Sequence, residues 1–159
     1  MCNKFSEEEY NRMLEKLFVR FPSFQKVGAG AYKPGIGNME FFDQLAGHPH
    51  RQYRIIHIAG TNGKGSTSST LAAILQESGY KVGLYTSPHL IDFRERMRVN
   101  GKVAPKEYVV EFVERHREFF EPLNPSFFEL TTAMAFNYFA EQEVDIAVVE
   151  VGLGGRLDC

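Results

Sequence analysis

The sequence feature that most constrains the fold is a glycine-rich turn that joins a β-branched run to a helical pattern. Residues 53–59 (Tyr-Arg-Ile-Ile-His-Ile-Ala) are predicted to form a strand that is buried on both faces. Residues 60–65 supply the turn, and residues 66–78 are predicted to form a helix that ends at Gly79. One face of that helix carries Leu71, Ile74 and Leu75. A second strand at 81–85 completes a unit of strand, helix and strand, for which we expect a right-handed parallel arrangement.

The rest of the chain continues to alternate helices and strands. Before the glycine-rich turn we predict a helix over 6–20 capped by Ser6, a loop over 27–38, and a short helix over 39–45 capped by Asn38. After the second strand we predict an Asn-Gly hairpin over 98–103, helices over 105–120 and 126–141, and a buried strand over 145–151. This alternation predicts an α/β fold with a doubly wound, mainly parallel sheet and flanking helices. In such a sheet the loops that follow the strands meet at one edge, so the loops after residues 59, 85 and 151 are expected to form one site.

The glycine-rich turn has the composition of a loop that binds phosphates. A protein that binds a phosphate must replace the hydrogen bonds of water, and glycines allow backbone N–H groups to approach the anion. The following helix adds its positive N-terminal end, and Lys64 is placed to reach the β- and γ-phosphates. The sequence therefore predicts a P-loop-type site for ATP, made of Gly60, Thr61, Asn62, Gly63, Lys64, Gly65, Ser66 and Thr67.

This loop departs from the common P-loop pattern, and the departure narrows the alternatives. Ile58 stands where that pattern has its first glycine, and Gly65 stands where Ser or Thr follows the lysine. We therefore interpret the loop as a shortened variant. A P-loop kinase or GTPase is disfavoured by Gly65, and a generic strand-to-helix turn is the remaining structural alternative.

Polar residues at the ends of the other two strands are candidates for the same site. Glu150 lies near the end of an otherwise apolar strand, where an unpaired carboxylate is costly. A metal ion, a bound water or a nearby arginine would each compensate its charge, and Ser87 offers a neutral oxygen after the neighbouring strand. His89 and His57 are candidates for metal or acid–base roles, with His57 interpreted as a satisfied core residue and His89 as a residue that lines the site.

Composition and charge exclude several other classes of function. The formal net charge of −2 gives no electrostatic basis for nucleic-acid binding. No run approaches the ~20 apolar residues of a membrane span, and the N-terminus has no apolar signal-peptide core, so the cytoplasm is the expected location. Cys2 and Cys159 lack the spacing of a metal site or a disulfide framework.

Four sequence blocks, in this order, resemble those of the folylpolyglutamate synthase / dihydrofolate synthase family of the Mur ligase superfamily. They are Gly60–Thr67, Thr-Ser-Pro-His-Leu at 86–90 with Glu95-Arg96, Phe-Phe-Glu-Leu-Thr at 127–131, and Glu-Val-Gly-Leu-Gly-Gly-Arg-Leu-Asp at 150–158. The resemblance implies that ATP phosphorylates the carboxylate of a folate or dihydropteroate. The amino group of L-glutamate then attacks the acyl phosphate, and an amide, ADP and phosphate result.

The resemblance also implies roles for particular residues. Lys64 and Glu150 are expected to be catalytic, and Ser87 and Glu150 to be the ligands of Mg²⁺. A pocket for the pterin-bearing substrate is expected at Gly35, Ile36, Ser126, Phe127, Phe128 and Glu129. An aromatic pair suits a flat heterocycle, although core packing is the alternative for Phe127 and Phe128.

The family pattern continues beyond Cys159. Residues 1–159 are therefore expected to be the N-terminal part of an ATP-binding domain of the Mur ligase type, without the rest of that domain and without the C-terminal glutamate-ligase domain. We expect the parent to be monomeric and this chain to be inactive alone and prone to self-association, because a sheet cut after a buried strand exposes unpaired edges. A Mur-type ligase for another carboxylate and a nucleotide-binding fragment without activity remain alternatives, as does the choice between dihydrofolate and polyglutamate synthesis.

Overall fold

A five-stranded sheet organises the molecule, and its strands run in the order β1-β5-β2-β3-β4. The structure is a computed structural model that describes residues 6–21, 35–152 and 154–155. The strands are β1 (Arg54–Ile58), β2 (Val82–Tyr85), β3 (Met97–Val99), β4 (Lys102–Val103) and β5 (Ile146–Glu150). β5 pairs in parallel with both β1 and β2, whereas β3 and β4 are antiparallel. The predicted α/β class with a mainly parallel sheet is therefore confirmed, with β5 inserted between the two strands of the first unit.

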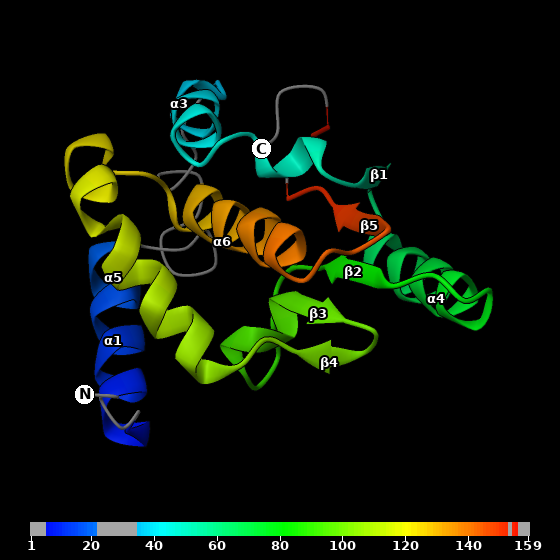
Figure 1. Cartoon of the computed structure of the whole chain (residues 1–159), viewed down its shortest axis with the longest axis horizontal. Coiled ribbons are helices and arrows are strands. Elements are labelled where there is room, and N and C mark those ends of the chain that lie inside the picture. The colour runs from blue at the N-terminus through cyan, green and yellow to red at the C-terminus, as the bar shows by residue number, and fades with distance from the viewer. Residues whose placement is uncertain (1–5, 22–34, 153, 156–159) are drawn as a thin grey trace.

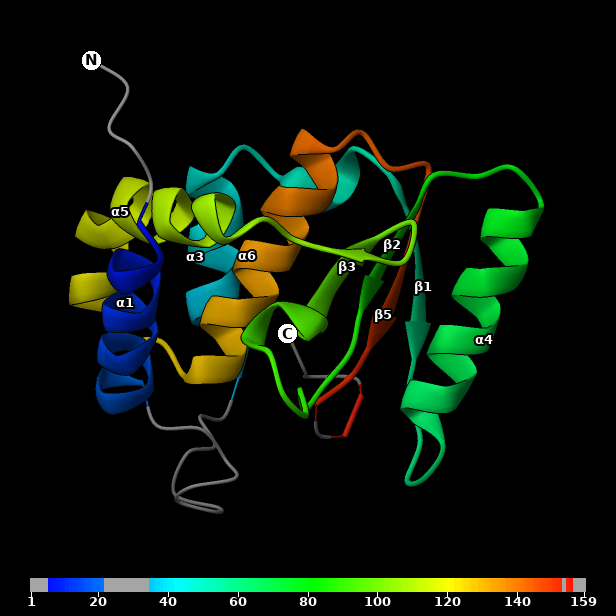
Figure 2. The ribbon, with the colours of Figure 1, turned by 90° about the horizontal axis from the view of Figure 1, so that it is seen from below.

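Helices cover the two faces of the sheet unequally (Figure 1). One face carries α4 (Lys64–Glu77), which contacts β2 and β5. The other face carries α6 (Phe127–Glu141), and α1 (Glu7–Arg20), α3 (Gly37–Leu45) and α5 (Lys106–Leu123) lie outside it (Figure 2). The 3₁₀ helices η2 (Pro49–Arg51) and η3 (Phe93–Arg96) precede β1 and β3.

The hydrophobic core is concentrated on the α6 side of the sheet. Ala147 and Val149 of β5 belong to the large cluster on this side, whereas Val148 belongs to a small cluster beneath α4. Alternate residues of β5 thus enter different layers, as the period of two in a strand requires. Every residue of β5 is buried, which confirms the prediction of a buried strand in this segment.

Local capping and turn signals in the sequence are confirmed. Ser6 accepts a hydrogen bond from the backbone N–H of Glu9 at the start of α1, at 3.1 Å. α6 begins one residue after Ser126, which was not predicted as a cap and forms a reciprocal capping box with Glu129. Asn100 and Gly101 adopt φ values of +47° and +75° between β3 and β4, as an Asn-Gly hairpin turn requires.

The prediction that the first strand is buried on both faces is wrong. β1 alternates between exposed and half-buried residues, and Ile55 is 38% exposed. The physical reason is its position at the edge of the described sheet, where α4 packs mainly on β2 and β5 and covers β1 less. The interpretation of His57 as a core residue fails for the same reason, since its side chain is exposed.

Two helix starts differ from the sequence prediction. α3 begins at Gly37 with Ile36 at its N-cap, so the prediction of Asn38 as a cap is wrong. The Asn38 side chain instead donates a hydrogen bond to the Glu129 carboxylate at 3.3 Å. α4 begins at Lys64, two residues earlier than predicted. Ile74, which is predicted to lie on the apolar face of this helix, is 57% exposed.

Some of the sequence predictions fall on residues outside the described ranges. Most of the loop predicted over 27–38 lies outside the described residues, as do Cys2 and Cys159. Across the described ranges, no helix is both long enough and apolar enough to cross a membrane.

The close approach of α6 to the sheet predicts the effect of one substitution. A Cβ atom added to Gly83 of β2 would lie 2.8 Å from the Phe139 ring of α6. Because both residues are packed in the core, Gly83→Ala is expected to lower the free energy of unfolding by about 1–3 kcal/mol. Urea denaturation of the two proteins measures this difference.

Gly37→Ala is the matched control, because a Cβ atom at Gly37 would meet nothing within 4 Å. We expect that variant to unfold at the wild-type urea concentration or slightly above it. Equal stability of Gly83→Ala and wild type would show that α6 does not pack on β2 as described.

Candidate active site

The loops that follow β1, β2 and β5 meet at one edge of the sheet (Figure 2). The strand register explains this, because Ile58 lies opposite Glu150 and Tyr85 lies opposite Val149. The predicted convergence of the three loops is confirmed. The glycine-rich loop, Ser87 and Glu150 are therefore neighbours although they are far apart in the sequence.

The glycine-rich loop leaves its backbone open to solvent at the start of α4. Gly60 and Gly63 have φ values of +152° and +76°, a region that glycine enters without a steric penalty. The first helical hydrogen bond runs from the N–H of Thr67 to the carbonyl of Gly63, at 2.9 Å. The N–H groups of the first turn therefore have no partner within the helix, and together with the helix dipole they favour an anion at this position. Lys64 donates from its Nζ to the carbonyl of Gly60 at 2.9 Å, so its charge lies across the loop.

Glu150 is the buried acidic group of this edge, with 5% of its surface exposed. Its Oε2 accepts a hydrogen bond from the backbone N–H of Ser87, at 3.1 Å. The same oxygen would lie 3.5 Å from a Cβ atom built on Gly65, so the carboxylate faces the first turn of α4. No arginine or lysine within the described ranges forms an ion pair with it, and the arginine alternative is therefore not observed there.

These donors determine what kind of metal ion the edge is able to hold. No group of three or more His, Cys, Asp or Glu side chains is arranged to bind a metal among the residues that the structure describes. A zinc-type site is thus not formed by them. A carboxylate and a hydroxyl-bearing residue side by side are instead oxygen ligands suited to Mg²⁺, which keeps several waters and takes the rest of its ligands from phosphates.

Residues predicted to bind the pterin-bearing substrate are brought together at the start of α6. The Oγ of Ser126 accepts from the N–H of Glu129 at 3.1 Å, and Glu129 Oε2 accepts from the N–H of Ser126 at 2.6 Å. Glu129 is buried and also accepts from Asn38, which ties α3 to α6. Gly35 and Ile36 directly precede α3, so the two predicted halves of the pocket are neighbours.

The two phenylalanines of the predicted pocket have different environments. Phe127 is buried and stacks on Phe18 of α1, with ring centroids 5.2 Å apart. Phe128 is only half-buried, and a Cβ atom at Gly152 would lie 2.7 Å from its ring. Core packing therefore describes Phe127 well. Phe128 lies against the segment that follows Glu150 and is the ring placed at the sheet edge.

Arg96 is a prominent residue of this region to which the sequence analysis gave no role. Its side chain is 4% exposed, its Nε donates to Nδ1 of His89 at 2.8 Å, and its guanidinium lies 5.1 Å from the centroid of the Phe127 ring. Burial and the charge of Arg96 lower the pKa of His89, which favours the neutral ring that accepts this bond. The block Glu95-Arg96 marked the segment, but the pairing with His89 depends on a chain reversal that periodicity does not reveal.

Glu95 produces that reversal in the loop after β2. Its carboxylate accepts hydrogen bonds from the backbone N–H groups of Leu90, Ile91 and Asp92, at 2.9–3.2 Å. These bonds lower the pKa of the Glu95 carboxyl group, because they favour its charged form. The loop that carries Ser87 and His89 is thus closed by one ionised side chain.

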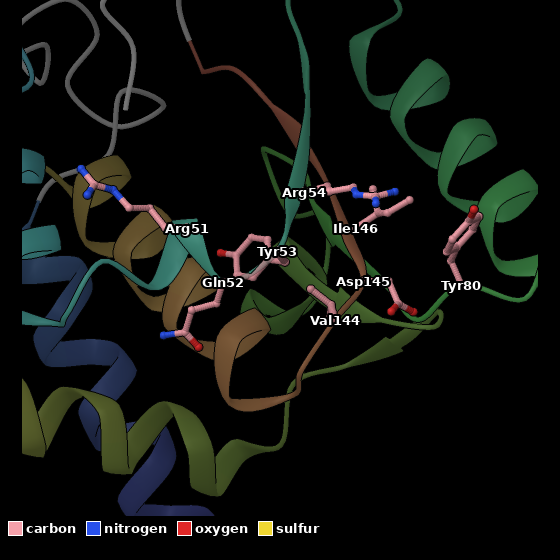
Figure 3. A pocket seen from close by; sticks show the side chains of 8 residues that line it. All are labelled: Arg51, Gln52, Tyr53, Arg54, Tyr80, Val144, Asp145 and Ile146. Atoms are coloured by element: carbon pink, nitrogen blue, oxygen red, sulfur yellow. The ribbon is translucent and has the colours of Figure 1, made fainter.

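A hollow of about 480 Å³ lies at the opposite, amino-terminal ends of the strands. Figure 3 shows its lining side chains, which come from residues 51–54, Tyr80 and residues 144–146. Asp145 already accepts a hydrogen bond from the backbone N–H of Lys81 at 2.7 Å, and Arg51 extends away from the other lining side chains. This hollow contains none of the predicted site residues, so it is not part of the candidate site.

Comparisons with known proteins agree with this arrangement. No protein-family model matches the chain. A dihydrofolate synthase/folylpolyglutamate synthase of Bacillus subtilis is 45% identical over 133 residues, which cover 79% of this chain and 31% of the relative. The crystal structure of a folylpolyglutamate synthase from Thermotoga maritima has a TM-score of 0.82 at 45% identity, and the match covers 94% of this chain and 34% of that one.

A third match is the structure of Escherichia coli FolC in complex with DHPP and ADP, with a TM-score of 0.82, 31% identity, and coverage of 94% of this chain and 34% of that one. The chain thus spans about a third of the length of these relatives. The identity extends over most of this chain, and the fold agrees over nearly all of it. The chain belongs to the folylpolyglutamate synthase / dihydrofolate synthase family.

Proposed function

We propose that this chain supplies the nucleotide-binding part of an ATP-dependent ligase that joins L-glutamate to the carboxylate of a folate or dihydropteroate. The observation that carries the proposal is the position of the Glu150 carboxylate, between the N–H of Ser87 and the first turn of α4. This is where the phosphates of a nucleotide on the glycine-rich loop and a magnesium ion would meet. The relatives support the chemistry, since two of them are named as synthases of this kind and the third is bound to ADP.

In this proposal the loop Gly60–Thr67 holds the phosphates of ATP. The N–H groups at the start of α4 donate to phosphate oxygens, and the exposed hydroxyls of Ser66 and Thr67 lie beside them. Lys64 exchanges its bond to the Gly60 carbonyl for a phosphate oxygen. Phosphoryl transfer depends mainly on positioning and on neutralisation of charge, and these residues contribute to both.

Ser87 and Glu150 are the proposed magnesium ligands. The buried carboxylate has a single hydrogen bond from the described residues, so one of its oxygens remains available to a cation. Magnesium, when bound, would neutralise the phosphate charge. The N–H of Ser87 fixes the orientation of Glu150, and the loop closed by Glu95 positions Ser87.

The acceptor is proposed to bind near the start of α6, with Phe128 as the accessible ring. Gly35, Ile36 and the Ser126–Glu129 capping box border this region. The described bonds of Ser126 and Glu129 are internal to the capping box and to Asn38, so we assign these two residues the task of shaping the pocket. Residues 1–159 are proposed as the N-terminal part of the ATP-binding domain of a longer, cytoplasmic enzyme, with self-association of the isolated chain through the exposed edge β1.

In an alternative to this proposal, the chain binds the nucleotide but does not catalyse amide formation. A chain that spans a third of its relatives is also suited to bind ATP without forming an amide. Nucleotide binding and ligase activity therefore need separate experiments.

The first experiment measures nucleotide binding by isothermal titration calorimetry. Lys64→Ala is expected to weaken ATP binding by about tenfold, which corresponds to about 1.4 kcal/mol. Glu150→Gln is expected to bind ATP equally well with magnesium and with a chelator, whereas the wild type binds better with magnesium. The matched control is Lys102→Ala, an exposed lysine of β4, for which we expect no change. Wild-type affinity in Lys64→Ala would refute the role of the loop.

The second experiment measures the reaction in a chimera. Residues 1–159 replace the matching segment of the Bacillus subtilis relative, and glutamate addition is followed with dihydropteroate and with tetrahydrofolate. We expect an ATP- and magnesium-dependent amide product, and a loss of about a hundredfold in Glu150→Gln, a magnitude found when metal sites are impaired.

The two acceptors distinguish dihydrofolate synthesis from polyglutamate extension. A chimera that binds ATP but forms no amide with either acceptor, while the unmodified relative does, would favour the binding-only alternative. An undiminished rate of amide formation in Glu150→Gln would show that Glu150 is not a ligand of the metal ion.

A further inference from the structure

Arg96 is a buried cation whose charge is not balanced by its described neighbours. The residue is 4% exposed, and its only side-chain hydrogen bond to the described residues runs from Nε to Nδ1 of His89. The two terminal nitrogens form no hydrogen bond or ion pair with any residue in the described ranges. Arg94, from the same 3₁₀ helix, differs sharply, since its guanidinium donates to both oxygens of Asp92 and to the carbonyl of Ala104.

The acidic groups of this region are already engaged elsewhere. Glu95 accepts three backbone N–H bonds, and Asp92 is paired with Arg94. Glu129 accepts from Ser126 and Asn38. His89 offers a lone pair but no negative charge. A largely buried side chain whose guanidinium has no counter-charge among the described residues is suited to bind an anion from outside the described chain.

The surroundings of Arg96 indicate the chemistry of that anion. The guanidinium lies over the ring of Phe127, which packs with Phe18 and Phe93. A planar guanidinium with its Nε already bonded presents its two terminal amino groups as a fork, which matches the two oxygens of a carboxylate. Aromatic rings beside a carboxylate-binding fork suit an acid whose carboxylate is attached to an aromatic ring.

The backbone of Arg96 places this fork next to the proposed magnesium site. The carbonyl of Arg96 accepts a hydrogen bond from the N–H of Thr86 at 3.1 Å. The following residue, Ser87, donates its own N–H to Glu150. An anion on Arg96 therefore lies on the side of the loop after β2 that faces α6, close to the residues assigned to magnesium and phosphate.

We propose that Arg96 binds the carboxylate of the acceptor substrate and orients it for phosphorylation. This inference rests on the proposed function, because it assigns a residue to the acceptor of that reaction. His89 is the positioning residue, since its Nδ1 fixes Nε and thereby the plane of the guanidinium. The competing explanation is that Arg96 only braces the loop against Phe127.

The test compares two ligands that differ only in one group on the aromatic ring, dihydropteroate with its carboxylate and the corresponding carboxamide. Calorimetry on the 159-residue chain is expected to show that the wild type prefers the carboxylate by about tenfold or more. Arg96→Gln is expected to lose this preference. It should bind the carboxylate more weakly, while its affinity for the carboxamide stays within about twofold of the wild-type value. Arg96→Lys, which keeps the charge without the fork, is expected to retain part of the preference.

Arg94→Gln is the matched control, since it removes a guanidinium from the same 3₁₀ helix and is expected to retain the full preference. The affinity for ATP is expected to be unchanged in Arg96→Gln. If this variant instead lost affinity for ATP and kept the carboxylate preference, Arg96 would be assigned to the nucleotide and the inference would be overturned. If Arg96→Gln bound the carboxylate and the carboxamide more weakly by the same factor, Arg96 would only support the loop, and the inference would be overturned as well.

The wild-type measurement separates this inference from the proposed function. If the wild type binds both ligands equally, the role of Arg96 is refuted while folate binding stands. If it binds neither ligand, the acceptor assignment of the proposed function fails and the inference fails with it. Neither outcome depends on whether a variant folds.

Discussion

The hydrogen bond between the N–H of Ser87 and the carboxylate of Glu150 joins the parts of the candidate site. It links the loop after β2 to the end of β5, and the same carboxylate faces the first turn of α4 at Gly65. A buried carboxylate with one backbone donor is poorly compensated, so its surroundings favour a cation. The position of this group follows from parallel pairing, which brings the carboxyl ends of β1, β5 and β2 to one edge.

Two glycines allow α6 to reach that edge. Gly83 leaves room for Phe139 against β2, and Gly152 leaves room for Phe128 just beyond β5. Any larger residue at either position would displace an aromatic ring, because a core packed at this density has little free volume. The start of α6, with its capping box and Phe127, is thereby set beside the buried Arg96 and its half-buried partner His89. The proposed acceptor region and the proposed phosphate region are thus carried by the same sheet and helix.

Much of this arrangement could be predicted from the sequence because its signals are local. The caps at Ser6 and Ser126, the Asn-Gly hairpin and the glycine-rich loop each depend on a few adjacent residues, and each is observed. The burial of β1 could not be predicted, because a β-branched run has the same pattern at an edge as in the middle of a sheet. The contact between Asn38 and Glu129 joins residues far apart in the sequence, and the contact between Arg96 and His89 depends on the chain reversal at Glu95, so neither follows from helix or strand periodicity.

Nucleotide, metal ion and the three loops are proposed to meet at Glu150. The most direct measurement is paramagnetic broadening of the backbone amide signals of the ¹⁵N-labelled protein by Mn²⁺, a substitute for magnesium. With ATP present, the signals of Gly65, Ser87 and Glu150 are predicted to broaden first and together, and Glu150→Gln is predicted to remove this selectivity. Broadening centred on another part of the chain, or the same pattern in Glu150→Gln, would contradict the account.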